Sequence, residues 1–234
     1  MDIAYYHSFL TARNNNPYVI DGIINDEQWN ATRCQVLFIL KETYGYSECR
    51  IFHMRDELPL WLKCKNKTYT KIAKLAMVIH DSFSKRRFFT SEEIEKLNFS
   101  HENLLGALRK CAVIEIKKHS GTSKKSDNRE INAEFIANRE LLQTQIDDIN
   151  PNVIIAGSTV CWNCLADKKI GIFREIAGLE LVKKHECGFF SNKVFYNAHH
   201  PASWRYGGFN IAEIYTRLFQ RITQNNSDWM TTNS

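Results

Sequence analysis

The chain lacks the features that mark several large classes of protein. No apolar run reaches the length of a membrane-spanning helix. The first residues, Met1 to His7, show no basic start followed by an apolar stretch, so we expect no signal peptide and a cytoplasmic protein. Neither G-x-x-x-x-G-K nor G-x-G-x-x-G occurs, which argues against P-loop and dinucleotide-binding folds. Helix-turn-helix and zinc-finger signatures are also absent, which weakens a transcription-factor interpretation.

Cysteine is present without a regular framework. The seven cysteines are an odd number and are scattered, as in a protein with free thiols in a reducing compartment. Cys161 and Cys164 form a C-x-x-C, but no second pair stands at zinc-ligand spacing. We therefore expect no metal and no other cofactor.

The charge is mildly basic and unevenly distributed. The formal net charge is +5, which is compatible with a polyanionic partner without demanding one. Basic residues gather in two stretches, and each is either a solvated face or a surface for an acidic partner. These stretches contain Lys63, Lys65, Lys67, Lys71 and Lys74, and then Lys117, Lys118, His119, Lys124, Lys125 and Arg129.

Four short apolar runs alternate with helical patterns. The runs cover residues 36–40, 112–116, 152–156 and 193–198, and they are typical of parallel strands buried on both faces. Helical patterns cover 59–112, 132–149 and 210–223, and a further helix is expected from about 159. The alternation predicts an α/β fold with a mostly parallel, four-stranded sheet. The length suits one domain, with a helical extension over 1–33, a core over 34–223 and a flexible tail over 224–234. The sequence does not show the oligomeric state, and we take a monomer as the default.

Each predicted strand runs into a polar segment. Because ligands bind at the carboxyl ends of parallel strands, we expect the four segments to meet in one active-site crevice. They are Lys41-Glu42-Thr43-Tyr44-Gly45, Glu115-Ile116-Lys117-Lys118, Gly157-Ser158 and His199-His200-Pro201.

In this order the segments resemble the landmarks of the uracil-DNA glycosylase superfamily. The most specific are Asn150-Pro151-Asn152-Val153-Ile154-Ile155-Ala156-Gly157 and Ala198-His199-His200-Pro201-Ala202-Ser203, and the likeness spans roughly residues 34–221. The resemblance implies a three-layer α/β/α fold. It also implies an enzyme that flips a base out of single- or double-stranded DNA and hydrolyses its N-glycosidic bond, leaving an abasic site.

The resemblance also implies catalytic roles. Glu42 would be the anion that steadies the developing sugar cation, with Thr43 holding water. His200 would donate to the departing base, and we favour it over His199 because neighbouring strand residues alternate faces. The alternative for Glu42 is an exposed turn acid or an N-cap partner.

Base recognition falls on Tyr44, Gly45 and Glu115 by the same likeness. Glu115 stands where uracil-reading relatives carry Asn, and an ionised carboxylate only accepts hydrogen bonds, which suits the amino group of cytosine. The sequence therefore favours a modified cytosine, such as the glucosylated hydroxymethylcytosine of phage DNA, over uracil. Alternatively, Glu115 faces away and pairs with a lysine. Phe52, Trp61 and Tyr44 are candidates for stacking on the base.

DNA contacts are expected from the segments around these residues. The residues assigned to this role are Lys117, Lys118, Ser158, Ser203, Trp204 and Arg205. Trp204 is a candidate wedge between bases, with an ordinary aromatic tucked against the last helix as the alternative. Two other functions stay open, a non-catalytic relative that binds DNA and an enzyme acting on a free phosphorylated small molecule.

Overall fold

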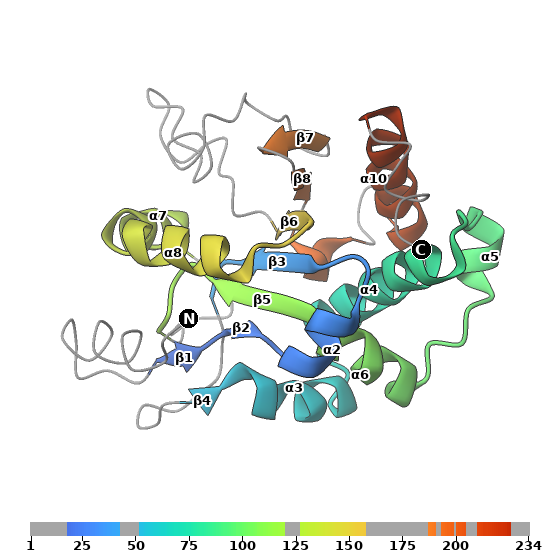
Figure 1. The fold of residues 1–234 in the computed structure, drawn as a ribbon. Coiled ribbons are helices and arrows are strands. Elements are labelled where there is room, and N and C mark those ends of the chain that lie inside the picture. The colour runs from blue at the N-terminus through green and yellow to red at the C-terminus, as the bar shows by residue number, and fades with distance from the viewer. Residues whose placement is uncertain are drawn as a thin grey trace.

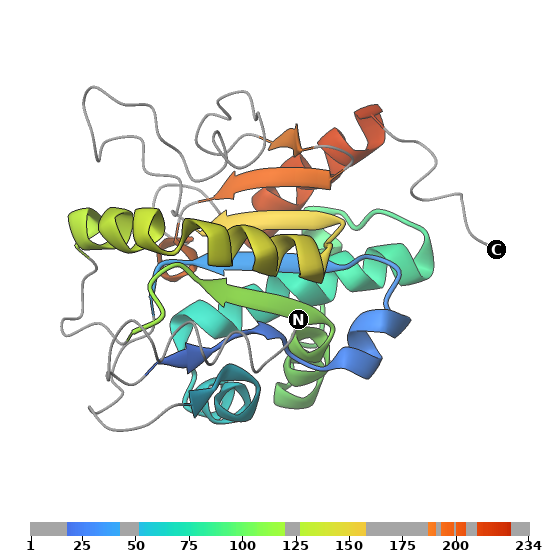
Figure 2. The ribbon, with the colours of Figure 1, turned by 60° about the vertical axis from the view of Figure 1, so that its left-hand side comes forward.

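The protein folds as a central sheet between two layers of helices (Figure 1). The structure is a computed structural model, and it describes residues 18–42, 52–119, 127–157, 187–190, 193–198, 200–204 and 210–225. Turning the molecule shows one helical layer in front of the sheet and the other behind it (Figure 2). The mixed α/β class and the mostly parallel sheet expected from the sequence are confirmed.

In the described part, the main sheet has six strands in the order β2-β5-β3-β6-β8-β7. The four central strands are parallel and match the four apolar runs, whereas the two edge strands are antiparallel to their neighbours. Their bounds are β2 Gly22–Ile23, β5 Cys111–Glu115, β3 Val36–Leu40, β6 Val153–Gly157, β8 Lys193–Ala198 and β7 Cys187–Phe190. A separate parallel pair joins β1 (Val19–Ile20) to β4 (Phe52–His53).

The central strands are apolar on both faces because helices cover both. Along β3, Val36, Phe38 and Leu40 belong to one buried cluster, and Leu37 and Ile39 belong to another. The first cluster is covered by α3 (Met54–Lys63), α4 (Lys67–Lys85), α5 (Ser91–Glu95), α6 (His101–Arg109) and α10 (Ile211–Asn225). The second is covered by α2 (Asp26–Ala31), α7 (Asn128–Ala137) and α8 (Arg139–Ile149). This two-sided burial explains the unbroken apolar runs.

Three expectations differ from the structure. The sheet, expected to have four strands, has six in the described part. The helix expected over 132–149 is two helices that meet at Asn138, which ends α7 and precedes α8. Residues 18–33, expected to belong to a helical extension, contain β1, β2 and α2, and β2 pairs with β5 in the main sheet. Residues 1–17 and 226–234 lie outside the described part. No helix in the described part is long and apolar enough to span a membrane.

The strand order creates a topological switch point beside β3. The chain passes from β3 to β5 on one side and then to β6 on the other side of β3. In open α/β sheets, the crevice outside the carboxyl ends of such a strand pair is the usual ligand site. Gly157 ends β6 there, and a Cβ added to it would lie 3.0 Å from both Leu40 Cδ2 and Pro201 Cδ. The segment that carries His200 is therefore packed tightly against the β3 and β6 ends.

Candidate active site

Glu42 follows β3 and its carboxylate is buried. Only 2% of the side chain is exposed, and Oε2 lies 3.2 Å from Lys117 Nζ in an ion pair. Lys117 also donates to Glu130 Oε1 at 2.6 Å. Burial alone would lower the pKa of Lys117, but the hydrogen bond to Glu130 and the negative charges of Glu42 and Glu130 raise it above its ordinary value. Glu42 is therefore an oriented, charge-balanced carboxylate rather than an exposed turn acid.

Glu115 ends β5 directly beside Leu40 and is fully buried. Tyr69, in the first turn of α4, donates its hydroxyl to Glu115 Oε1 at 3.1 Å. Among the described residues Oε2 has no hydrogen-bond partner. Burial raises the pKa of Glu115 well above its ordinary range, and the nearby Asp21 charge raises it further. The environment thus favours a neutral carboxyl group with one oxygen still to be satisfied.

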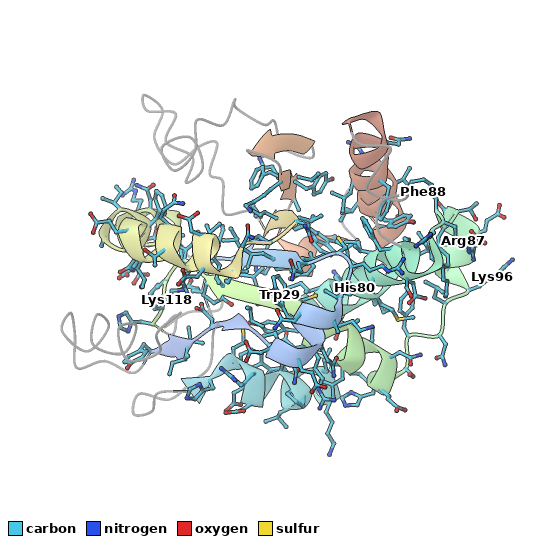
Figure 3. All side chains as sticks on the ribbon, viewed as in Figure 1. Trp29, His80, Arg87, Phe88, Lys96 and Lys118 are labelled. Carbon is cyan, nitrogen blue, oxygen red and sulfur yellow. The ribbon has the colours of Figure 1, made fainter. Side chains whose placement is uncertain are left out.

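Lys118 is a structural residue, which corrects the expectation that it contacts DNA. Its side chain is 0% exposed, and Nζ donates to Asp21 Oδ1 at 2.9 Å, to Asp21 Oδ2 at 2.8 Å and to Gln145 Oε1 at 2.9 Å. Asp21 Oδ2 also accepts the backbone N–H of Glu115 at 2.6 Å. Figure 3 shows Lys118 beside the α7 and α8 layer. The network fixes the end of β5 and holds the Lys118 ammonium group away from any phosphate.

Lys117 was also expected to contact DNA, and its side chain is likewise buried. Only 6% of its side chain is exposed, because Glu42 and Glu130 hold it against the protein. An ammonium group held between two carboxylates does not line a DNA backbone. Its role in this structure is to orient Glu42.

His200 lies just after β8 and is held in one tautomer. Nδ1 of the ring accepts the backbone N–H of Ala202 at 3.2 Å, so the neutral ring carries its proton on Nε2. Burial, followed by the charges of Lys41 and Lys71, lowers the pKa of His200 to about 4. The imidazole is therefore neutral at pH 7, with its proton on Nε2.

Trp204 closes the short turn that follows His200, and it is not a wedge. Its side chain is 1% exposed and belongs to the same core cluster as Ile214 and Tyr215 of α10. The turn η1 (Pro201–Ser203) is held by Lys71, whose Nζ donates to Ala202 O at 2.8 Å. Trp204 is therefore a buried core aromatic rather than an exposed one.

Several predicted residues lie outside the described residues, and four important ones were missed. The first group is Thr43, Tyr44, Gly45, Ser158, Arg205, the side chain of Ser203 and that of Phe52. The missed residues are Asp21, Tyr69, Lys71 and Gln145, whose contacts reach across long stretches of chain. Trp61, a candidate for stacking on the base, stacks on Tyr69 in the structure, with ring centroids 4.5 Å apart. No local pattern marks these residues, because an isolated acid or a helical tyrosine is common anywhere.

The carboxyl edge of the sheet therefore presents an oriented anion at Glu42, a carboxyl group with an unsatisfied oxygen at Glu115 and a neutral N–H donor at His200. Within the described ranges, no three His, Cys, Asp or Glu side chains gather as metal ligands. We compared the chain with protein-family models, with curated proteins and with solved structures, and no match was found in any of them.

Proposed function

We propose that this protein is a monofunctional DNA glycosylase that hydrolyses the N-glycosidic bond of a flipped-out pyrimidine and leaves an abasic site. The observation that carries the proposal is that Glu42, Glu115 and His200 stand at or just after the carboxyl ends of β3, β5 and β8, and β3 and β8 both flank β6 at the switch point. It supports the residue assignments that the resemblance to the uracil-DNA glycosylase superfamily implies.

The chemistry asks for an anion near the sugar and a donor near the base. Bond cleavage develops positive charge on the deoxyribose and negative charge on the departing base. Glu42, oriented by Lys117, supplies the negative charge and positions the attacking water. His200 Nε2–H donates to the base oxygen as charge builds there, and a neutral ring suffices for this role.

Glu115 reads the base in this proposal. An ionised Glu115 accepts from the cytosine amino group, and a protonated Glu115 additionally donates to the cytosine ring nitrogen. We propose a modified cytosine as the first substrate, which would direct the enzyme against modified phage DNA. Uracil is the second candidate, because a protonated carboxyl also matches the uracil N3–H and O4, and the raised pKa of Glu115 favours that form.

The test is base release from DNAs that carry uracil, cytosine, hydroxymethylcytosine or glucosylated hydroxymethylcytosine, scored by alkali cleavage at abasic sites. Glu42→Gln and His200→Ala should each lower the rate by about a hundredfold or more, because each removes a charge or donor used in the transition state. Glu140→Gln, on the exposed surface of α8, is the matched control and should keep full activity.

The panel also separates the candidate substrates. Release of a modified cytosine alone supports the first substrate, and release of uracil alone supports the second. The amide of Glu115→Gln always offers both a donor and an acceptor. The rates at which this variant releases the modified cytosine and uracil should therefore converge. Tight DNA binding without release of any base would contradict the glycosylase and favour a non-catalytic DNA-binding protein.

A further inference from the structure

A groove of about 880 Å³ opens beside the candidate active site, along α4. Its walls come from the end of α3, the first turns of α4, the end of α5, the start of α6, and residues near 202–204 and 210–212. None of Glu42, Glu115 and His200 lines it. The groove is therefore a second feature, adjacent to the strand ends but distinct from them.

The rim of the groove is strongly basic. Five lysines line it, and the described lining residues include a single acid, Glu95. The five are Lys63, Lys65, Lys67, Lys71 and Lys74, which form the first basic stretch of the sequence. The first turns of α4 line the groove, and the positive end of this helix dipole is not offset, because the first turn has no acidic residue. The charge favours an anionic occupant.

The remaining lining is largely apolar and partly aromatic. It includes Leu62, Ile94, Phe99, Leu104, Trp204 and Ile211. Lys74 Nζ lies 4.6 Å from the centroid of the Phe99 ring, so a cation and an aromatic face stand side by side. A groove that joins cations to apolar and aromatic surface suits a ligand with both phosphates and flat rings.

Lys65 occupies a backbone conformation that disfavours lysine. Its φ is 54°, in the left-handed region where glycine or asparagine normally ends a helix. The residue is nevertheless an exposed lysine at the rim of the groove. A lysine at such a position costs stability that asparagine would spare, which points to a use for its charge.

The groove is linked to His200 through two hydrogen bonds. Lys71, on the groove wall, donates to Ala202 O at 2.8 Å. The N–H of the same Ala202 donates to His200 Nδ1 at 3.2 Å. Ala202, which lines the groove, therefore contacts the residue proposed as the leaving-group donor.

We propose that this groove binds the single-stranded DNA segment next to the target nucleotide. The exposed lysines Lys63, Lys65 and Lys67 contact successive phosphates, and the bases lie against the partly exposed Phe99 and Ile211. This inference rests on the proposed function for the identity of the strand, and it deepens that function by naming a single-stranded partner. Charge and stacking of this kind bind single strands without reading their sequence.

The experiment measures fluorescence anisotropy of a labelled oligothymidylate of about 15 nucleotides, across a salt series. Lys63→Gln/Lys67→Gln should bind about tenfold more weakly, and the slope of log affinity against log salt should fall by about 0.7 for each lost phosphate contact. Lys85→Gln/Lys110→Gln removes the same charge outside the groove and should change neither quantity.

A second variant separates binding from folding. Lys65→Asn should raise the thermal midpoint, because asparagine tolerates the left-handed conformation, and should still weaken binding of the oligothymidylate. Affinity equal to that of the control pair in both groove variants would overturn the proposal. Equally tight binding of a matched duplex, or of thymidine monophosphate at equal phosphate concentration, would also overturn it.

Failure of this proposal is distinguishable from failure of the proposed function. Glu42→Gln should bind the oligothymidylate like the unmodified protein, whatever its effect on base release. If the groove variants lose binding and the unmodified protein releases no base, the groove proposal stands and the glycosylase proposal is rejected. If the unmodified protein releases a base and the groove variants bind the oligothymidylate unchanged, the glycosylase proposal stands and the groove proposal is rejected.

Discussion

The buried ion pair of Lys118 and Asp21 is the residue-scale feature on which the site depends. Both side chains are 0% exposed. Burial lowers the pKa of Lys118, and the neighbouring Asp21 charge opposes that effect. Asp21 simultaneously accepts the N–H of Glu115. A single buried carboxylate therefore fixes both the lysine and the residue proposed to read the base.

Lys118→Met tests this role. The change leaves Asp21 as a buried charge without its cation, and breaking such a pair from one side costs about 3–5 kcal/mol. We expect the urea midpoint to fall accordingly. The double variant Asp21→Asn/Lys118→Met should recover part of the loss, because no unpaired charge remains. An unchanged midpoint in the single variant would show that the pair contributes nothing.

Roles of single residues were the hardest to predict from the sequence. Lys118 was expected on a DNA surface because it stands in a basic stretch, yet Asp21 lies 97 positions away in the chain. Trp204 was expected to reach outward from its turn, but it is buried in the core, where that turn packs against α4. The positions of Glu42, Glu115 and His200 were easier to predict, because the end of a buried strand fixes where a residue can lie.

At the scale of elements, the strands that are buried on both faces of the sheet are the ones that the sequence predicts. The runs behind β3, β5, β6 and β8 are unbroken because helices cover both sides of the sheet. The edge strands β2 and β7 have two and four residues, too few to display a period. Long, doubly buried elements are therefore visible in a sequence, and short edge strands are not.

Gly157→Ala tests the tight junction of elements at the switch point. The new Cβ would lie 3.0 Å from Leu40 Cδ2 and Pro201 Cδ, so β3 or the His200 segment must shift. We expect a loss of about 1–3 kcal/mol in the free energy of unfolding, measured in urea, and slower base release per folded molecule.

Gly106→Ala is the matched control for this change. Gly106 lies inside α6, and a Cβ there would meet nothing within 4 Å. Alanine is the better helix former, so this variant should gain about 0.5–1 kcal/mol. Equal stability changes in the two variants would contradict the packing described for Gly157.

The protein as a whole holds neutral histidines at both ends of the sheet. His200 lies at the carboxyl end, and His80 contacts Cys111 at the start of β5, with Nε2 3.4 Å from Sγ. Figure 3 shows His80 on the opposite side from Lys118. Burial, followed by the charge of Lys110, lowers the pKa of His80 to about 3. Acid therefore acts on the entire fold by charging groups that the native state keeps neutral.

The sign of this effect follows from the two pKa values. Unfolded histidine has a pKa of about 6.5, so the unfolded chain binds one more proton at His80 than the native chain between about pH 6.5 and 3. The stability from a neutral His80 is fully present above the unfolded pKa and is lost as pH falls through this window. The slope is about 1.4 kcal/mol per pH unit.

His80→Gln should remove that slope, whatever it does to stability at pH 7. We expect the difference in unfolding free energy between pH 6 and pH 4.5, measured in urea, to shrink by about 2 kcal/mol in the variant. Glu115 cannot explain such a loss of slope. Its raised pKa makes stability fall as pH rises, which is the opposite sign, and Glu115 is present in both proteins. Identical pH dependence in both proteins would contradict this account, because it would mean that the native state protonates His80 as readily as the unfolded chain does.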